Sequence, residues 1–428
     1  MVMLSTQSKT NNTLIAKRNY TFDAVGRVSA RTQTRGTDTA RNDSFGYNDR
    51  SELTSATLGS DNYAYNFDNI GNRITAAELA DEIAYSANNL NQDTSIEKNT
   101  QTPFVPTFDD DGNQLTVQTA TGVWNVTYNA ENRPITFTQG TTVIECKYDS
   151  QGRRFEKKVT ANNVVTFWQR YAYKGYLQIA AFNVTLETVD EVETEEYTLA
   201  TTTYWDSTEP VATRPMAFTD HTGENAITYF YTHDLTKNVC EVLSRDGSAV
   251  SVVTEYDYTS FGAVTASNTA TPNIFMFSSE VFDPETLLIY YNYRHYNPLD
   301  GRWISRDPIE ENGGWNLYSM VRNSTINLND VYGEGIKDFF SAIWTGITTA
   351  FAPPGLSEVC GALEIAAESL KPGIIALRVK AIISRAHKEC VIDDTEALDY
   401  YDRVSSLLSS GNSKGMIDIV SEIKQKAK

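Results

Sequence analysis

A short motif recurs through the first 155 residues and constrains the fold more than any other feature of the chain. It consists of an aromatic residue, an Asp or Asn, a turn residue that is often Gly, and then Arg or Gln with an aliphatic residue. The aromatic anchors are Tyr20, Tyr47, Tyr65, Tyr85, Phe108, Tyr128 and Tyr148. Most anchors lie about 20 residues apart, and tandem motifs at such a spacing are typical of repeat architectures in which each unit buries its face against the next.

Each copy of the motif predicts a β-hairpin. Asp or Asn followed by Gly is typical of a turn, because Gly accepts a positive φ and Asx side chains bond their own backbone. The aromatic residue ends one strand and the aliphatic residue begins the return strand. A single hairpin is marginally stable in water, so many must lie side by side to bury a face. We therefore expect a mainly β fold, and 24 Tyr in the chain agree with it.

The repeat loosens between residues 171 and 215. This stretch is acidic and ends with Pro210 and Pro215, and Pro is confined to the edges and loops of sheets. We expect a long hairpin or an insertion that faces solvent. Further hairpins follow, with turns at Asp246-Gly247 and Phe261-Gly262.

The tandem pattern resembles the YD repeats of bacterial Rhs proteins, of the C components of insecticidal toxin complexes, and of animal teneurins. The resemblance covers residues 20–333. It implies that the hairpins wind as a spiral of β-sheet into a hollow shell. Because about 310 residues of hairpins are few for a closed shell, we expect a partial one.

The segment from Glu280 to Gly333 carries the most specific motif. The string YYNYRHYNPLDGRWISRDPI, from Tyr290 to Ile309, is similar to the Rhs repeat-associated core. In that family the core closes the shell where a variable region begins. The resemblance thus divides the chain into a repeat shell (1–270), a core (271–333) and a variable C-terminal region (334–428).

Self-cleaving members of the family carry two Asp-Pro-x-Gly motifs in this core. The resemblance places the two aspartates at Asp307 and Asp330, and cleavage after Gly333. It implies aspartyl-type chemistry, in which two close carboxylates share one proton, one activates water and the other protonates the amide. Arg306 would orient one carboxylate by a bidentate contact. Asp307, Asp330 and Arg306 are therefore the catalytic candidates.

The chain departs from the family motif at three positions. Glu310 replaces the first Gly, Val331 replaces the second Pro, and Glu334 replaces the apolar residue that usually follows the final Gly. Altered turns displace catalytic groups, and small displacements lower a rate strongly. Two interpretations stay open, a self-cleaving core and a structural one in which Arg306 pairs with Asp307 and Asp330 caps a turn.

The composition and the remaining motifs argue against several other functions. The formal net charge of −19 makes nucleic-acid binding by the shell unfavourable. The cysteines lie far apart at 146, 240, 360 and 390, without metal-ligand spacing, and we expect them to be free and buried. The sequence predicts neither a cofactor nor a metal ion, and no further enzyme motif is present. No signal peptide is visible at Met1.

After Gly333 the hydrophobic period changes from two to 3.6, which predicts a small all-α region. The expected helices span about 336–347, 356–370, 372–389, 395–408 and 416–427. The resemblance places the variable payload here, often a toxin enclosed by the shell. No catalytic motif identifies its activity. Trp344 and two Phe could contact a membrane, but a bundle core is the favoured interpretation.

Two functions of different classes follow. The first is a polymorphic-toxin shell fragment that encloses its own C-terminal region and releases it by self-cleavage near Gly333. The resemblance then implies a secreted or cell-surface location, with an immunity protein and secretion-machinery components as partners. The second is a structural or adhesive cell-surface protein, teneurin-like in role, without toxin or protease activity. A carbohydrate-binding β-protein is a third interpretation without a distinctive site.

Overall fold

The computed structural model describes residues 2–7, 14–189, 192–207, 214–247, 249–267, 271–330, 333, 394–409 and 413–426. The chain separates into two compact units, Met1–Phe339 and Phe340–Lys428. The first unit is built mainly of antiparallel strands with three short 3-10 helices, and α-helices are described only in the second. The predicted fold class, a YD-repeat β-hairpin shell followed by a helical C-terminal region, is confirmed.

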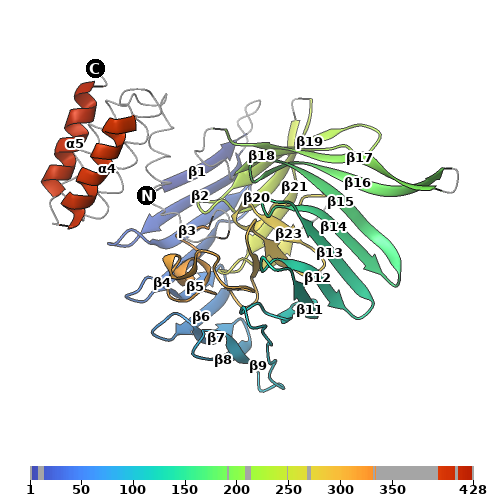
Figure 1. The fold of residues 1–428 in the computed structure, drawn as a ribbon, viewed down its shortest axis with the longest axis horizontal. Coiled ribbons are helices and arrows are strands. Elements are labelled where there is room, and N and C mark those ends of the chain that lie inside the picture. The colour runs from blue at the N-terminus through green and yellow to red at the C-terminus, as the bar shows by residue number, and fades with distance from the viewer. Residues whose placement is uncertain are drawn as a thin grey trace. The chain divides into compact units, whose positions relative to one another are not determined.

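Nine strands form the first sheet, and each pairs with the next strand along the chain. They appear in blue in Figure 1. The strands are β1 (Val2–Gln7), β2 (Leu14–Phe22), β3 (Val28–Arg35), β4 (Arg41–Tyr47), β5 (Leu53–Leu58), β6 (Asp61–Phe67), β7 (Arg73–Glu78), β8 (Asp81–Ala87) and β9 (Asp93–Lys98). This order is the stack of hairpins that the motif predicts.

Thirteen strands form the second sheet, again in sequence order. The strands are β10 (Thr116–Thr119), β11 (Gly122–Tyr128), β12 (Pro134–Gln139), β13 (Thr142–Tyr148), β14 (Arg154–Ala161), β15 (Val164–Lys174), β16 (Leu177–Val189), β17 (Val192–Trp205), β18 (Pro215–Asp220), β19 (Ile227–His233), β20 (Val239–Asp246), β21 (Ala249–Tyr258) and β22 (Val264–Ser267). The β16–β17 pair is the long solvent-facing hairpin expected between residues 171 and 215, and it projects from the sheet in Figure 1.

A β-bulge marks the same position in each repeat, directly before the Asx residue. The register shifts at Phe22, Tyr47, Phe67, Ala87, Tyr128 and Tyr148. Tyr20, Tyr65 and Tyr85, which the sequence suggested as anchors, therefore lie two residues upstream of the equivalent position. A period of two puts residues i and i+2 on one face of a strand, which is why the sequence alone misaligned these repeats.

The turn that follows the bulge is held by the Asx side chain. In the first repeat, Asp23 Oδ1 accepts hydrogen bonds from the backbone N–H groups of Val25 and Arg27, at 3.1 and 2.9 Å. Gly26 then adopts a φ of +90°. Other repeats place a different residue in this left-handed position, among them Ser51, Asn91, Asn132 and Lys237. The carboxylate or amide cap, more than the Gly, defines the turn.

Tyrosine hydroxyl groups connect successive repeats. The hydroxyl of Tyr148 donates to the carbonyl of Pro134 at 2.8 Å, and that of Tyr128 donates to the carbonyl of Gln114 at 2.8 Å. Tyr47, Tyr173 and Tyr258 make the equivalent bond to a carbonyl 19 residues earlier. A buried ring with a satisfied hydroxyl group contributes both packing and alignment of neighbouring hairpins.

Replacing one such tyrosine tests this role. Tyr148→Phe leaves the ring in place but removes the donor to the Pro134 carbonyl, so we expect the free energy of unfolding to fall by about 1 kcal/mol. Urea denaturation followed by tryptophan fluorescence measures the change. The control is Tyr204→Phe, because Tyr204 is 53% exposed and water can replace its bonds. Equal losses in both variants would contradict the assignment.

The core segment forms a third, four-stranded sheet of short strands. They are β23 (Val281–Asp283), β24 (Leu288–Tyr290), β25 (His295–Asn297) and β26 (Arg302–Trp303). Side chains of this segment join the hydrophobic clusters of both large sheets: Ile326 packs against the first, and Leu288 and Ile304 belong to the second. The segment is thus the common core of the first unit.

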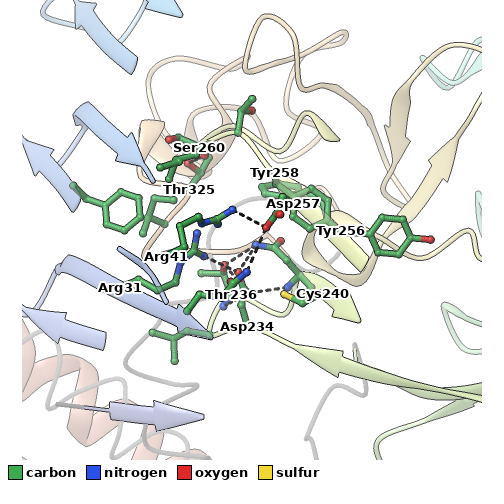
Figure 2. Close-up of a pocket in the computed structure, with 18 of the residues that line it drawn as sticks. Arg31, Arg41, Asp234, Thr236, Cys240, Tyr256, Asp257, Tyr258, Ser260 and Thr325 are labelled. Carbon is green, nitrogen blue, oxygen red and sulfur yellow. Dashed lines mark hydrogen bonds and ion pairs between the residues drawn. The ribbon is translucent and has the colours of Figure 1, made fainter. Parts of the chain in front are cut away.

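A buried charge network joins the beginning of the first sheet to the end of the second. Arg18 on β2 donates to both carboxylate oxygens of Glu241 on β20, and Arg35 on β3 contacts Glu241 at 2.8 Å. Arg35 and Arg41 also contact Asp257 on β21, each at 2.9 Å. Figure 2 shows Arg41 directed at Asp257 across a cavity of about 30 Å³. We call this network the seam.

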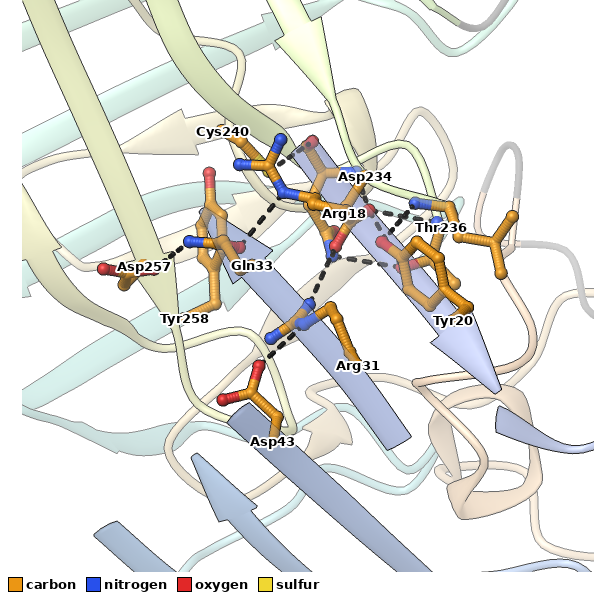
Figure 3. Close-up of polar contacts among 12 residues, drawn as sticks. Arg18, Tyr20, Arg31, Gln33, Asp43, Asp234, Thr236, Cys240, Asp257 and Tyr258 are labelled. Carbon is orange, nitrogen blue, oxygen red and sulfur yellow. Dashed lines mark hydrogen bonds and ion pairs between the residues drawn. The ribbon is translucent and has the colours of Figure 1, made fainter. Parts of the chain in front are cut away.

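A second layer of the seam lies beside it. Arg31 contacts Asp43 at 2.8 Å within the first sheet and Asp234 at 3.5 Å in the second, as Figure 3 shows. Gln33 accepts a hydrogen bond from Arg18 at 3.0 Å. Buried charges are expensive unless they are paired and hydrogen-bonded, and here each has such partners.

The buried ion pairs of the seam predict that the fold loses stability at acidic pH. Burial raises the pKa of Glu241, but Arg18 and Arg35 outweigh it, so the pKa lies below the ordinary value of 4.5. A lowered pKa in the folded state stabilises the fold above pH 4.5, and this contribution is lost as the pH falls through the folded pKa.

We therefore expect Glu241→Gln to reduce stability at pH 7 by about 3 kcal/mol and to flatten the decline of stability below pH 4.5. Denaturant titrations across this pH range measure both effects. The exposed Glu195, also paired with arginine, serves as the control, and Glu195→Gln should change little. An unchanged acid profile for Glu241→Gln would show that the seam does not control acid stability.

The second unit contains two described helices, α4 (Asp394–Ser409) and α5 (Ser413–Lys426). They pack through Val404, Ile419, Val420 and Ile423, and Arg403 pairs with Glu422 at 2.7 Å. The helices predicted at 395–408 and 416–427 are confirmed, whereas those at 336–347, 356–370 and 372–389 lie outside the described residues. Within the described ranges, no helix has both the length and the apolarity that a membrane crossing requires.

The prediction that the cysteines are free and buried is confirmed for the two that the structure describes. Cys146 and Cys240 are buried free thiols. Burial raises the pKa of Cys240 to about 12, which makes this thiol unreactive. Cys360 and Cys390 lie outside the described residues.

Candidate functional site at the end of the core

Asp307 begins a tight turn after β26. Its Oδ1 accepts the backbone N–H of Ile309 at 3.1 Å, and its carbonyl accepts that of Glu310 at 3.0 Å. Glu310 has a φ of +54°, the left-handed conformation that favours Gly. Glu310 thus occupies a backbone conformation that Gly adopts at lower cost.

Asp330 forms a matching turn at the end of the core. Its Oδ1 accepts the backbone N–H of Gly333 at 2.8 Å, and Gly333 has a φ of +79°. The side chain of Asp330 is 2% exposed. Val331, the second departure from the motif, lies outside the described residues. Asp330 thus caps a turn, as the structural interpretation expects, while also pointing its other oxygen into the core.

Arg294 brings the two aspartates together. Its Nη2 lies 3.0 Å from Asp307 Oδ2 and 3.3 Å from Asp330 Oδ2. Its Nε donates to the carbonyl oxygen of Gly333 at 2.6 Å, and the guanidinium stacks on Trp303, 4.1 Å from the ring centre. One buried cation therefore contacts both carboxylates and the carbonyl group at which cleavage was predicted.

The orienting role predicted for Arg306 stays a prediction, and among the described contacts none joins Arg306 to either aspartate. Arg306 is exposed, and its side-chain stem runs close to Gly112 instead of toward the aspartates. Arg306 is exposed whereas the adjacent Asp307 is buried, so the two side chains lie on different sides of this segment. The guanidinium that contacts Asp307 is that of Arg294.

Sequence reasoning missed Arg294 because it lies 13 residues before Asp307, outside both aspartate motifs. A signal was present in the string YYNYRHYN, where an arginine stands among four tyrosines. Such surroundings are typical of a buried, stacked guanidinium. The predicted pair Asp307 and Asp330 is brought together by the structure, and their catalytic role stays a prediction.

The surroundings of Asp307 disfavour its ionisation. Burial raises the pKa of Asp307, Arg294 opposes the rise, and the nearby Asp330 adds to it. Two like charges close together repel, so the charge of Asp330 disfavours ionisation of Asp307. Burial also raises the pKa of the neighbouring Glu280, and the charge of Asp330 contributes.

A cavity of about 400 Å³ adjoins the pair. Core residues line it on one side and the turns of the second and third repeats on the other. Its lining includes Asp307, Asp330, Arg294, Trp315, Arg322, Arg50 and Gly71. This volume admits water and a short stretch of peptide to the carboxylates.

Comparison with known proteins finds solved structures that share this fold. A crystal structure described as TcdB2-TccC3-TEV matches with a TM-score of 0.61 and 20% identity, over 78% of this chain and 18% of that one. A crystal structure described as TcdB2-TccC3 without the hypervariable C-terminal region matches equally well, with a TM-score of 0.61. These matches confirm the predicted YD-repeat shell fold.

Parts of known protein sequences are also similar to this chain. The tRNA3(Ser)-specific nuclease WapA of Bacillus spizizenii is 27% identical over 303 residues, which are 67% of this chain and 11% of the relative. Toxin subunit YenC2 of Yersinia entomophaga is 46% identical over 54 residues, which are 13% of this chain and 6% of the relative. The chain thus spans about a tenth or less of the length of these relatives. No protein-family model matches the chain.

The strained turn at Glu310 gives a prediction. Glu310→Gly releases about 1–2 kcal/mol of left-handed strain and costs about 0.5–1 kcal/mol of chain entropy, so we expect a small net gain in stability. Thermal denaturation measures it. Glu311→Gly is the matched control, because Glu311 is not among the residues with positive φ and should only lose stability. A loss of stability in Glu310→Gly would contradict the geometry of this turn.

Proposed function

We propose that this chain is the C-terminal part of a toxin-type YD-repeat shell whose core cuts its own backbone after Gly333. The observation that carries the proposal is the position of Arg294, which contacts Asp307, Asp330 and the Gly333 carbonyl at once. A purely structural ion pair would not need the third contact.

The reaction follows from these contacts. In this proposal Asp330 acts as the general base and removes a proton from a water molecule, whose oxygen attacks the Gly333 carbonyl carbon. The N–H of Arg294 Nε donates to the carbonyl oxygen and stabilises the negative charge that develops there. Asp307, whose pKa is raised, keeps its proton and gives it to the amide nitrogen of Glu334 as the C–N bond breaks. The products are a shell that ends in the Gly333 carboxylate and a fragment that begins at Glu334.

The role of the shell is proposed from its relatives. They carry the names of toxin subunits and of tRNA nucleases. We infer that residues 334–428 form the payload enclosed by such a shell, that the protein acts outside the producing cell, and that an immunity protein accompanies it. A structural or adhesive protein would need neither the acid pair nor cleavage, so the cleavage experiment separates the two functions.

The full chain tests the proposal directly. We expect the 47.8 kDa chain to yield two fragments on a denaturing gel, and Asp307→Asn, Asp330→Asn and Arg294→Ala to stay intact. Arg306→Ala is the matched control, since Arg306 is exposed, and it should cleave like the unaltered chain. An unaltered chain that stays intact would exclude the protease, whereas cleavage of the Asp330→Asn variant would exclude this mechanism.

A further inference from the structure

The indole ring of Trp303 lies against the cation that joins the acid pair to the Gly333 carbonyl. The guanidinium carbon of Arg294 is 4.1 Å from the centre of this ring. Both side chains are buried, and each residue is 2% exposed. The contact therefore joins a desolvated cation to an aromatic face, the arrangement in which such contacts are strongest. The mechanism proposed above gives this ring no part.

The ring occupies a side of the guanidinium that its hydrogen bonds leave open. All the N–H groups of a guanidinium lie in one plane and point outward from its edge. Arg294 uses this edge for Asp307 and Asp330, through Nη2, and for the Gly333 carbonyl, through Nε. A ring against the face fixes the plane of the group without competing for any N–H. The contact thus sets the orientation in which one arginine can bind all three partners.

The ring of Trp303 is itself held in place by its surroundings. Tyr291 and Tyr296 meet it edge-on, with ring centres 4.9 and 5.5 Å away and interplanar angles of 81° and 64°. Edge-to-face contacts of this kind are specific in geometry. The backbone N–H of Trp303 donates to the carbonyl of Tyr318 at 2.9 Å, and β26 pairs Trp303 with Tyr296 of β25. The indole is thus a fixed platform for the guanidinium.

The charge of Arg294 needs such a platform. Burial lowers the pKa of Arg294 below its ordinary value, although Asp307 and Asp330 both act in the opposite direction. Removal from water therefore costs this cation more than the two carboxylates return. The negative face of an indole ring attracts a cation without adding a further buried charge that would need partners of its own.

We propose that Trp303 is a positioning residue for self-cleavage, whose indole face holds the Arg294 guanidinium in the plane that reaches both aspartates and the Gly333 carbonyl. The ring acts through Arg294. The property that matters is the negative potential of the ring face, and the bulk of the side chain alone does not supply it. This inference rests on the proposed self-cleavage.

The test changes the charge distribution of the ring while its shape changes little. The full chain is made by cell-free synthesis with tryptophan analogues that carry one, two or three ring fluorines at position 303 alone, and fragment formation is followed over time. Each fluorine withdraws electron density from the ring face. We expect the logarithm of the cleavage rate to fall in steps with the number of fluorines, by about tenfold in total, as the loss of a desolvated cation–ring contact implies.

The matched control is the same series at Trp124, which is also 2% exposed. Its indole N–H donates to Thr121, and its ring packs in the hydrophobic cluster of the second sheet. Fluorine at this position should leave the cleavage rate unchanged. Urea denaturation in an Asp330→Asn background, which keeps the chain intact, should show equal stability in the two series.

Two ordinary substitutions give a second readout. Trp303→Phe keeps an aromatic face against the guanidinium, so we expect it to cleave at about a third of the original rate. Trp303→Leu keeps an apolar side chain without a ring face, and we expect it to slow cleavage about tenfold or more. Equal rates in these two variants would show that the ring face has no special role.

The outcomes separate the two proposals. A rate that fluorine at position 303 does not change, or that falls equally in the Trp124 series or in parallel with stability, overturns the positioning role and leaves the protease intact. An unaltered chain that does not cleave overturns the proposed function, and the inference falls with it. A stepwise fall confined to position 303, at equal stability, supports both.

Discussion

The structure depends on hydrogen bonds between the core segment and the turns of successive repeats. Each turn leaves backbone groups that its own hairpin does not satisfy, and buried backbone groups must find partners. The core supplies them in order. Asn327 accepts from the backbone N–H of Val28, Asn323 donates to the Gly71 carbonyl, and the Tyr318 hydroxyl donates to the Gly112 carbonyl.

The same contacts continue into the second sheet. Arg133 donates to the carbonyl of Asn292 at 3.0 Å, and the Tyr290 hydroxyl accepts the backbone N–H of Arg154 at 2.8 Å. Arg154 in turn pairs with Asp283, at 2.6 and 3.0 Å. The repeats therefore need the core to satisfy their turns, and the core needs the repeats to hold its irregular backbone. Arg294 lies within this framework, so the geometry of the acid pair follows from the assembly of the whole unit.

Much of this fold is readable from the sequence because it is built from local signals. The Asp and Gly of a motif such as Asp23 to Gly26 define a turn within a few residues, and the order of the strands follows from hairpins joined in sequence. The alignment of the repeats was less certain, because Tyr20 and Phe22 share one face and either could be taken as the anchor. The helices at 394–426 follow likewise from local periodicity.

Only part of the candidate site could be predicted from the sequence. The spacing of Asp307 and Asp330 pointed to the pair, but their partner could not be found by proximity in sequence. Arg306 is adjacent to Asp307 and points away, whereas Arg294 reaches it through the fold of the core. Of the three departures from the family motif, the described one, Glu310, has a left-handed φ of +54°, a conformation that Gly adopts at lower cost.

The central claim is that the acid pair delivers water to the Gly333 carbonyl. Mass spectrometry of the shell fragment formed in water enriched in oxygen-18 tests it most directly. The account predicts a fragment whose last residue is Gly333 and whose new carboxylate carries one heavy oxygen atom from solvent. A fragment that ends at another residue, or one that ends at Gly333 without the heavy oxygen, would contradict it.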